Sequence, residues 1–151
     1  MTRDDYFVGG CTALLDAVGT AVNNIINIRK KTPKNTHPGK TVFVITTDGM
    51  ENASVEYNYK KIQTLIKNQQ EKYGWEFIFL GANIDVAAEA QRMGVRRERS
   101  VAFHCDSVGI DLSYEAVSDA ITACRVCMEI PDDEWRKKID EDYEKRNNHK
   151  K

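Results

Sequence analysis

Two short runs of nearly continuous apolar residues constrain the fold of this chain more than any other feature of its sequence. One extends from Thr41 to Thr47 (TVFVITT) and the other from Trp75 to Leu80 (WEFIFL). A strand with one solvent-exposed face alternates apolar and polar residues, whereas a strand that is buried on both faces does not. The two runs therefore predict strands of a buried parallel sheet, and residues 100–104 (SVAFH) predict a third.

Helical patterns lie before, between and after these strands. Apolar residues recur at helical spacing within residues 14–26 and 62–73. Gly74 and Gly94 are typical of residues that end helices, and Ser113 is the predicted N-cap of the last helix of the domain. The alternation of helices and strands predicts a doubly wound, Rossmann-like α/β fold with a mostly parallel sheet of about three to four strands.

The chain is predicted to consist of one domain with a C-terminal addition. Residues 1–130 form the α/β domain, and residues 131–151 form an appended amphipathic helix with a polar tail. Within that addition Trp135, Ile139 and Tyr143 recur every four residues, as on one face of a helix. Residues 29–40 (RKKTPKNTHPGK) predict a surface loop whose basic side chains are solvated.

Composition and charge exclude several classes of protein. The chain is 41% hydrophobic and carries 22 Lys and Arg against 23 Asp and Glu. It is therefore not a large disordered protein, and it lacks the basic surplus that nucleic-acid binding requires. No apolar run of about 18 residues is present, so no membrane contact is expected and a cytoplasmic location is predicted.

Candidate ligand-binding residues follow the first strand and precede the first helix. Asp48 comes directly after the first strand, and Thr12 comes directly before the first helix. Ligands of open α/β sheets bind beyond the carboxyl ends of the strands, where both side chains are expected. A hydroxyl and a carboxylate suit a hard cation such as Mg²⁺. The alternative is purely structural, with Thr12 capping the helix and Asp48 making a turn.

The same two segments resemble motifs of a known family. Residues 9–14 (GGCTAL) and residues 44–52 (VITTDGMEN) are similar to the second and third metal-site motifs of a von Willebrand factor A domain. The resemblance implies a metal-ion-dependent adhesion site, with Thr12 as a hydroxyl ligand and Asp48 in the metal shell, directly or through water. Residues 77–83 (FIFLGAN) resemble the bacterial intracellular members most closely.

The chain also departs from the family pattern. The first metal-site motif of the family, D-x-S-x-S, is absent, so the resemblance implies an N-terminally truncated A domain with a weak, incomplete Mg²⁺ site. The strand that carries that motif in the family lies beside the strand equivalent to residues 41–47. Without it, this strand becomes a sheet edge that pairs readily with another chain. A homodimer or a partner strand is expected there, and the C-terminal helix is a second candidate cover or interface.

The resemblance favours a non-enzymatic protein-interaction module that associates with itself through the exposed sheet edge. Two alternatives stay open at this point. One is a small metal-dependent α/β hydrolase that uses Asp48 and Glu51, for which no matched nucleophile is evident. The other is a truncated gene product without an independent function.

Overall fold

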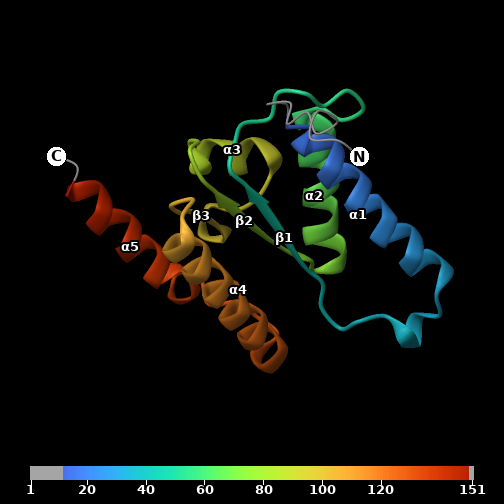
Figure 1. The fold of residues 1–151 in the computed structure, drawn as a ribbon. Coiled ribbons are helices and arrows are strands. Elements are labelled where there is room, and N and C mark those ends of the chain that lie inside the picture. Colours follow the sequence, from blue (N-terminus) through green and yellow to red (C-terminus); the bar gives the residue numbers. More distant parts are fainter. Residues whose placement is uncertain (1–11, 150–151) are drawn as a thin grey trace, which may run out of the picture.

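The computed structural model describes residues 12–149 and confirms an α/β fold with a parallel sheet (Figure 1). The strands are β1 (Val42–Thr47), β2 (Glu76–Gly81) and β3 (Ser100–Ala102), in the spatial order β1-β2-β3. Both pairs are parallel, with Val44 opposite Ile78 and Leu80 opposite Val101. Within the described residues β2 is thus the central strand, and β1 and β3 are the two edges.

Helices cover both faces of this sheet. The α-helices are α1 (Leu14–Lys31), α2 (Tyr59–Tyr73), α3 (Val86–Met93), α4 (Ser107–Cys127) and α5 (Lys137–Asn148). Short 3₁₀ turns are η2 (Lys34–Thr36), η3 (Arg97–Arg99) and η4 (Glu134–Arg136). The first three α-helices lie on one face of the sheet, and α4 and α5 lie on the other. Within the described part of the chain, no helix is long and apolar enough to cross a membrane.

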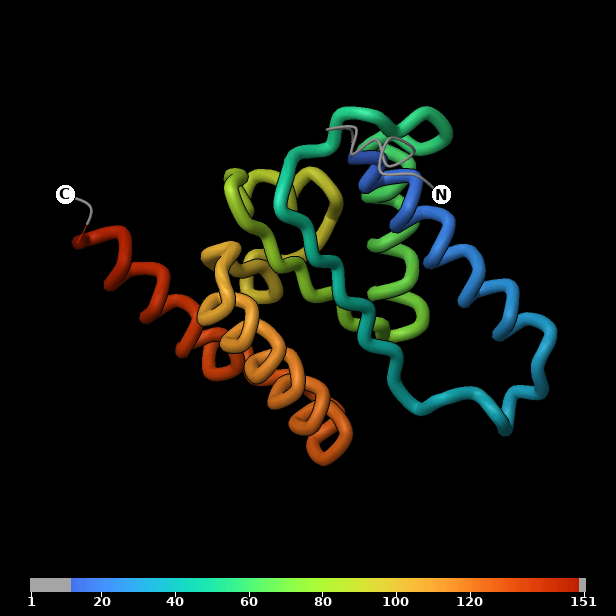
Figure 2. The backbone as a smooth tube through the Cα atoms, in the orientation of Figure 1, coloured from blue at the N-terminus to red at the C-terminus, as the bar shows by residue number. Residues whose placement is uncertain are grey.

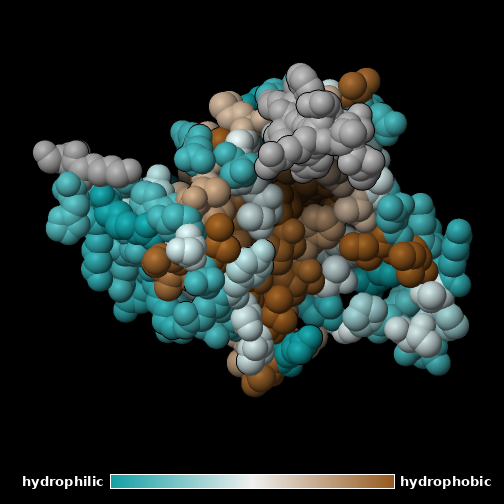
Figure 3. Space-filling model, in the orientation of Figure 1, coloured by the Kyte–Doolittle hydropathy of each residue, from teal (hydrophilic) through white to brown (hydrophobic). Residues whose placement is uncertain are grey.

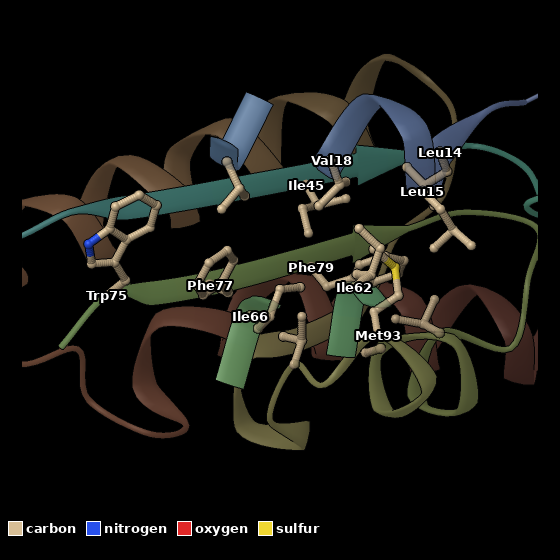
Figure 4. Packing of buried hydrophobic residues seen from close by; sticks show 14 residues of the cluster. Leu14, Leu15, Val18, Ile45, Ile62, Ile66, Trp75, Phe77, Phe79 and Met93 are labelled. Carbon is tan, nitrogen blue, oxygen red and sulfur yellow. The ribbon is translucent and has the colours of Figure 1, made fainter. Parts of the chain in front are cut away.

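Two hydrophobic clusters form the core, one on each face of β2. Phe77 and Phe79 point into the cluster beneath α1, α2 and α3 (Figure 4). Ile78 and Leu80 point into the second cluster, beneath α4 and α5. Every residue of β2 is buried, which explains why its sequence shows no alternation.

Local sequence signals define most helix ends. Asn58, Asp85 and Asp106 cap α2, α3 and α4, because each side chain accepts a hydrogen bond from the N–H three residues later. Gly74 and Gly94 end α2 and α3 in the left-handed conformation, as predicted. The prediction for Ser113 is wrong. This residue lies inside α4, where its hydroxyl donates to the Gly109 carbonyl at 2.7 Å.

The C-terminal helix covers the β3 edge rather than the β1 edge. Ile139 and Trp135 are 1% and 5% exposed and belong to the second core cluster. Arg136 donates to the carbonyl of Ser100, the first residue of β3. The sequence-based suggestion that this helix shields residues 41–47 is therefore wrong, since its apolar face packs at the opposite edge of the sheet.

We expect the substitution Ile139→Ala to reduce the free energy of unfolding by about 2–5 kcal/mol, because it leaves a cavity in a closely packed cluster. The control is Val126→Ala on α4, where the side chain is 77% exposed and the expected change is below about 0.5 kcal/mol. Denaturation by urea measures both values. Equal, small effects would mean that α5 does not pack as described.

Candidate functional site

A cavity of about 580 Å³ opens at the carboxyl end of the strands. Residues from both layers of helices line it, with Thr12 and Leu14 on the side of α1 and Ser113 and Tyr114 on the side of α4. Asp48 forms part of the wall at the end of β1. The location agrees with the general rule for ligand sites in open α/β sheets.

The structure brings together the two residues that the sequence singled out. Thr12 and Asp48 both line this cavity. The Thr12 N–H donates to Asn52 Oδ1 at 2.7 Å, and the Asn52 N–H donates back to the Thr12 carbonyl at 3.1 Å. These two bonds hold the segment before α1 against the loop that follows β1. The Asp48 side chain is exposed.

Glu51 fixes the shape of this loop. Its Oε2 accepts hydrogen bonds from the Leu15 N–H at 2.8 Å and from the Ser54 hydroxyl at 2.8 Å. Its Oε1 accepts from the N–H groups of Ala53 at 3.0 Å and Ser54 at 2.6 Å. Burial raises the pKa of the Glu51 carboxyl, but these hydrogen bonds outweigh it, so the net pKa lies below the ordinary value.

Asp16 ties the second half of the loop to the first turn of α1. Its carboxylate accepts from the N–H groups of Val55 at 2.8 Å, Glu56 at 3.0 Å and Tyr57 at 2.8 Å. The hydrogen bond from Val55 is the main cause of a lowered pKa at Asp16. Figure 2 shows the result, with the loop after β1 folded over the beginning of α1. No sequence signal predicts this role of Asp16, because its partners are backbone groups about 40 residues away.

The donors at the cavity do not by themselves make up a Mg²⁺ site. Mg²⁺ requires near-octahedral oxygen coordination and is held by carboxylates together with several waters. Thr12 and Asp48 supply one hydroxyl and one carboxylate, and both oxygens of Glu51 already accept two hydrogen bonds each. Within residues 12–149, no three His, Cys, Asp or Glu side chains form a metal-binding group. Any ion here would take its remaining ligands from elsewhere.

β1, whose carboxyl end lines this cavity, is an outer strand of the sheet, so one of its two edges does not face β2. The carbonyls of Thr41 and Thr47 accept from β2 or its flanking residues, so the backbone groups of odd-numbered residues face β2. By alternation, Val42, Val44 and Thr46 direct their N–H and C=O groups away from β2. Among the described residues no other strand pairs with that side.

Apolar side chains flank this open edge on both faces. Phe43 is only half-buried and packs with the cluster that includes α1, while Val42 and Val44 are half-buried and pack with the cluster that includes α4. Figure 3 shows a hydrophobic band in the middle of the molecule over β1, between the more hydrophilic surfaces of the helices on either side. β1 carries no charged residue and no proline, the usual protections of an edge strand.

Comparison with protein-family models, with curated proteins and with solved structures gave no match to this chain. The relation to von Willebrand factor A domains therefore rests on the sequence motifs and stays a prediction.

The hydrogen bonds of Glu51 predict a pH-dependent contribution to stability. We expect Glu51→Gln to reduce the free energy of unfolding at pH 7 by about 1–3 kcal/mol, because its amide cannot accept all four bonds. The carboxyl has a lowered pKa in the folded state. Its contribution is therefore complete well above its ordinary pKa of 4.5 and is lost as the pH falls through the lower, folded-state value.

The control for this experiment is Glu56→Gln in the same loop, where the side chain is exposed. Urea denaturation from pH 7 down to about pH 3 should show wild type and Glu51→Gln converging in stability, while Glu56→Gln follows wild type throughout. A constant difference between wild type and Glu51→Gln over this range would contradict the assigned role.

Proposed function

We propose that this chain is a non-enzymatic protein-interaction module of the von Willebrand factor A type, which associates with a second copy of itself through β1. The observation that carries the proposal is the edge of β1 that no other strand of the described chain covers, with outward N–H and C=O groups at Val42, Val44 and Thr46. Unpaired edges of this kind are templates for strand addition. A cytoplasmic location belongs to the same proposal.

A second copy is a suitable occupant because the edge is complementary to itself. In an antiparallel pair centred on Val44, that residue lies opposite its own counterpart, and Val42 lies opposite Thr46 of the other copy. The segment is uncharged, so no like charges oppose each other across the pair. Pairing would also extend the sheet, so that the half-buried apolar side chains on both faces of β1 would gain neighbours from the second copy.

A weak Mg²⁺ site is the second part of the proposal. Thr12 and Asp48 would hold the ion with one hydroxyl and one carboxylate, and the other ligands would be water or groups from a bound protein. The hydrolase alternative gains no support, because Glu51 accepts four hydrogen bonds and has no lone pair left for proton abstraction in this arrangement.

The substitution Val44→Lys tests the association. It places two ammonium groups opposite each other at the centre of the pair, so the dimer Kd should rise at least about 100-fold. Light scattering after size exclusion measures the mass of the protein in solution. The control is Val55→Lys, at a loop position that is 92% exposed, which should leave the mass of the dimer unchanged.

Hydrogen exchange gives a second measurement of the same contact. In the dimer the amides of Val42, Val44 and Thr46 should be protected to a similar degree as those of Phe43 and Ile45, which face β2. A monomer at all accessible concentrations, with fast exchange at Val42, Val44 and Thr46 alone, would rule out self-association. In that case the β1 edge would either bind a different protein or have no role in binding.

The Mg²⁺ part has its own test in thermal unfolding. If Mg²⁺ binds the folded state, millimolar Mg²⁺ should raise the Tm by mass action, and Asp48→Ala should remove the increase. The control is Asp119→Ala, which removes an exposed carboxylate on α4. Asp85→Ala would not serve, because the Asp85 side chain caps α3 and its loss would lower stability by itself. An equal response in wild type, Asp48→Ala and Asp119→Ala would reject the site.

A further inference from the structure

A second cavity, of about 540 Å³, lies at the opposite, amino end of the sheet. It is formed where the end of α1, the loop after it and the end of α2 surround Trp75, which directly precedes β2. The side chains that matter for its chemistry are Arg29, Lys30, Lys34, His37, Tyr73 and Trp75. Its volume lies within the range of small-molecule sites, which is about 300–1,000 Å³.

The charge of this cavity is one-sided. Arg29, Lys30 and Lys34 are basic side chains, and the described residues that line the cavity include no Asp or Glu. Basic residues in the last turn of α1 are an ordinary complement to the helix dipole. Lys34 and His37 are not part of that turn, however, because they come from the following loop and η2 and still face the same space.

The position of the guanidinium of Arg29 is fixed before any ligand arrives. Its Nη1 donates to the Thr41 hydroxyl at 3.0 Å, and its Cζ lies 5.8 Å from the centroid of the Trp75 ring. The loop is also held in place, since His37 Nε2 lies 3.1 Å from the Thr32 carbonyl oxygen. Cationic groups held in this way lose little conformational entropy when an anion binds.

Trp75 supplies an independent observation. The side chain is 2% exposed, and its indole N–H has no hydrogen-bond partner within residues 12–149. Figure 4 shows the indole nitrogen on the side of the ring that faces away from Phe77 and the rest of the cluster. Buried donors are almost always paired, so one left without an acceptor calls for an explanation. The other tryptophan is paired, because Trp135 Nε1 donates to the Glu98 carbonyl at 3.1 Å.

We propose that this cavity binds a small organic phosphate that carries a flat ring. The phosphate would bind among Arg29, Lys30 and Lys34, which can form charge-assisted hydrogen bonds with its oxygens. The ring would pack on Tyr73, whose side chain is 62% exposed beside the cavity. Trp75 also lines the cavity, but its indole N–H has less than 1 Å² of accessible surface, so it would pair with an acceptor on the ligand only if the side chains around it move apart on binding.

This inference is independent of the proposed self-association. The cavity lies at the amino end of the sheet, whereas Thr12 and Asp48 lie at the carboxyl end. A dimer without ligand binding and ligand binding without a dimer are both possible results. Failure of one proposal therefore does not imply failure of the other.

The test is an NMR titration that follows the two indole N–H signals of the full chain in buffer with physiological salt. The probes are adenosine monophosphate, adenosine and inorganic phosphate. We expect adenosine monophosphate to shift the Trp75 signal with a Kd of about 1 mM or lower. The Trp135 signal should stay in place, because its N–H already donates to the Glu98 carbonyl and Trp135 does not line this cavity.

Paired variants of equal charge separate a site from general attraction. Lys30→Gln with Lys34→Gln should raise the Kd at least about tenfold. Lys31→Gln with Lys67→Gln removes two exposed lysines that do not line the cavity and should change it less than about twofold. Equal weakening by the two pairs would overturn the proposal, because the attraction would then be non-specific.

The other probes make each part of the proposal falsifiable. If adenosine shifts the Trp75 signal as strongly as adenosine monophosphate does, the phosphate contributes nothing and the proposal is wrong. Inorganic phosphate binding with the same affinity would remove the role of the ring and leave a simple anion site, which also contradicts the proposal. Absence of any Trp75 shift with adenosine monophosphate would reject the ligand class altogether.

Discussion

Burial of β2 on every side is the constraint on which the rest of this structure depends. A strand with apolar residues on both faces needs a strand at each edge and a helical layer above and below, because no part of it tolerates water. β1 and β3 provide the edges, and the two helical layers provide the covers. Both cavities lie at the ends of the strands, because the faces and edges of the central strand are already filled by this packing.

Signals that act within a few residues of one another were sufficient to predict most of the fold. The apolar runs marked the strands, helical spacing marked α1 and α2, and Gly74 marked a helix end because its role depends only on its own backbone. The start of α4 was missed although Asp106 is a good N-cap. Ser113 resembles an N-cap in sequence because it is a small polar residue, whereas in the structure it is buried inside the helix.

The contacts between distant segments could not be predicted in the same way. An amphipathic pattern shows that one face of α5 is buried but does not identify its neighbour, so the β1 edge and the β3 edge were equally acceptable. Thr12 and Asp48 were brought together because parallel strands share one carboxyl end, which is a topological rule. The basic loop and Trp75 follow no such rule. Their sequence patterns predict a solvated loop and a strand residue, and only the tertiary structure places them around one cavity.

The two edges of the sheet also differ in what they permit an assembly to become. Arg136 and α5 occupy the outer side of β3, whereas no other strand within residues 12–149 pairs with the outer side of β1. A sheet with two free edges can add copies without limit and grow into a fibre. With one edge blocked, addition through β1 stops once two copies have met, because the resulting pair exposes only the covered β3 edges. The position of the C-terminal helix would thus make the assembly a closed pair, with a built-in protection against polymerisation.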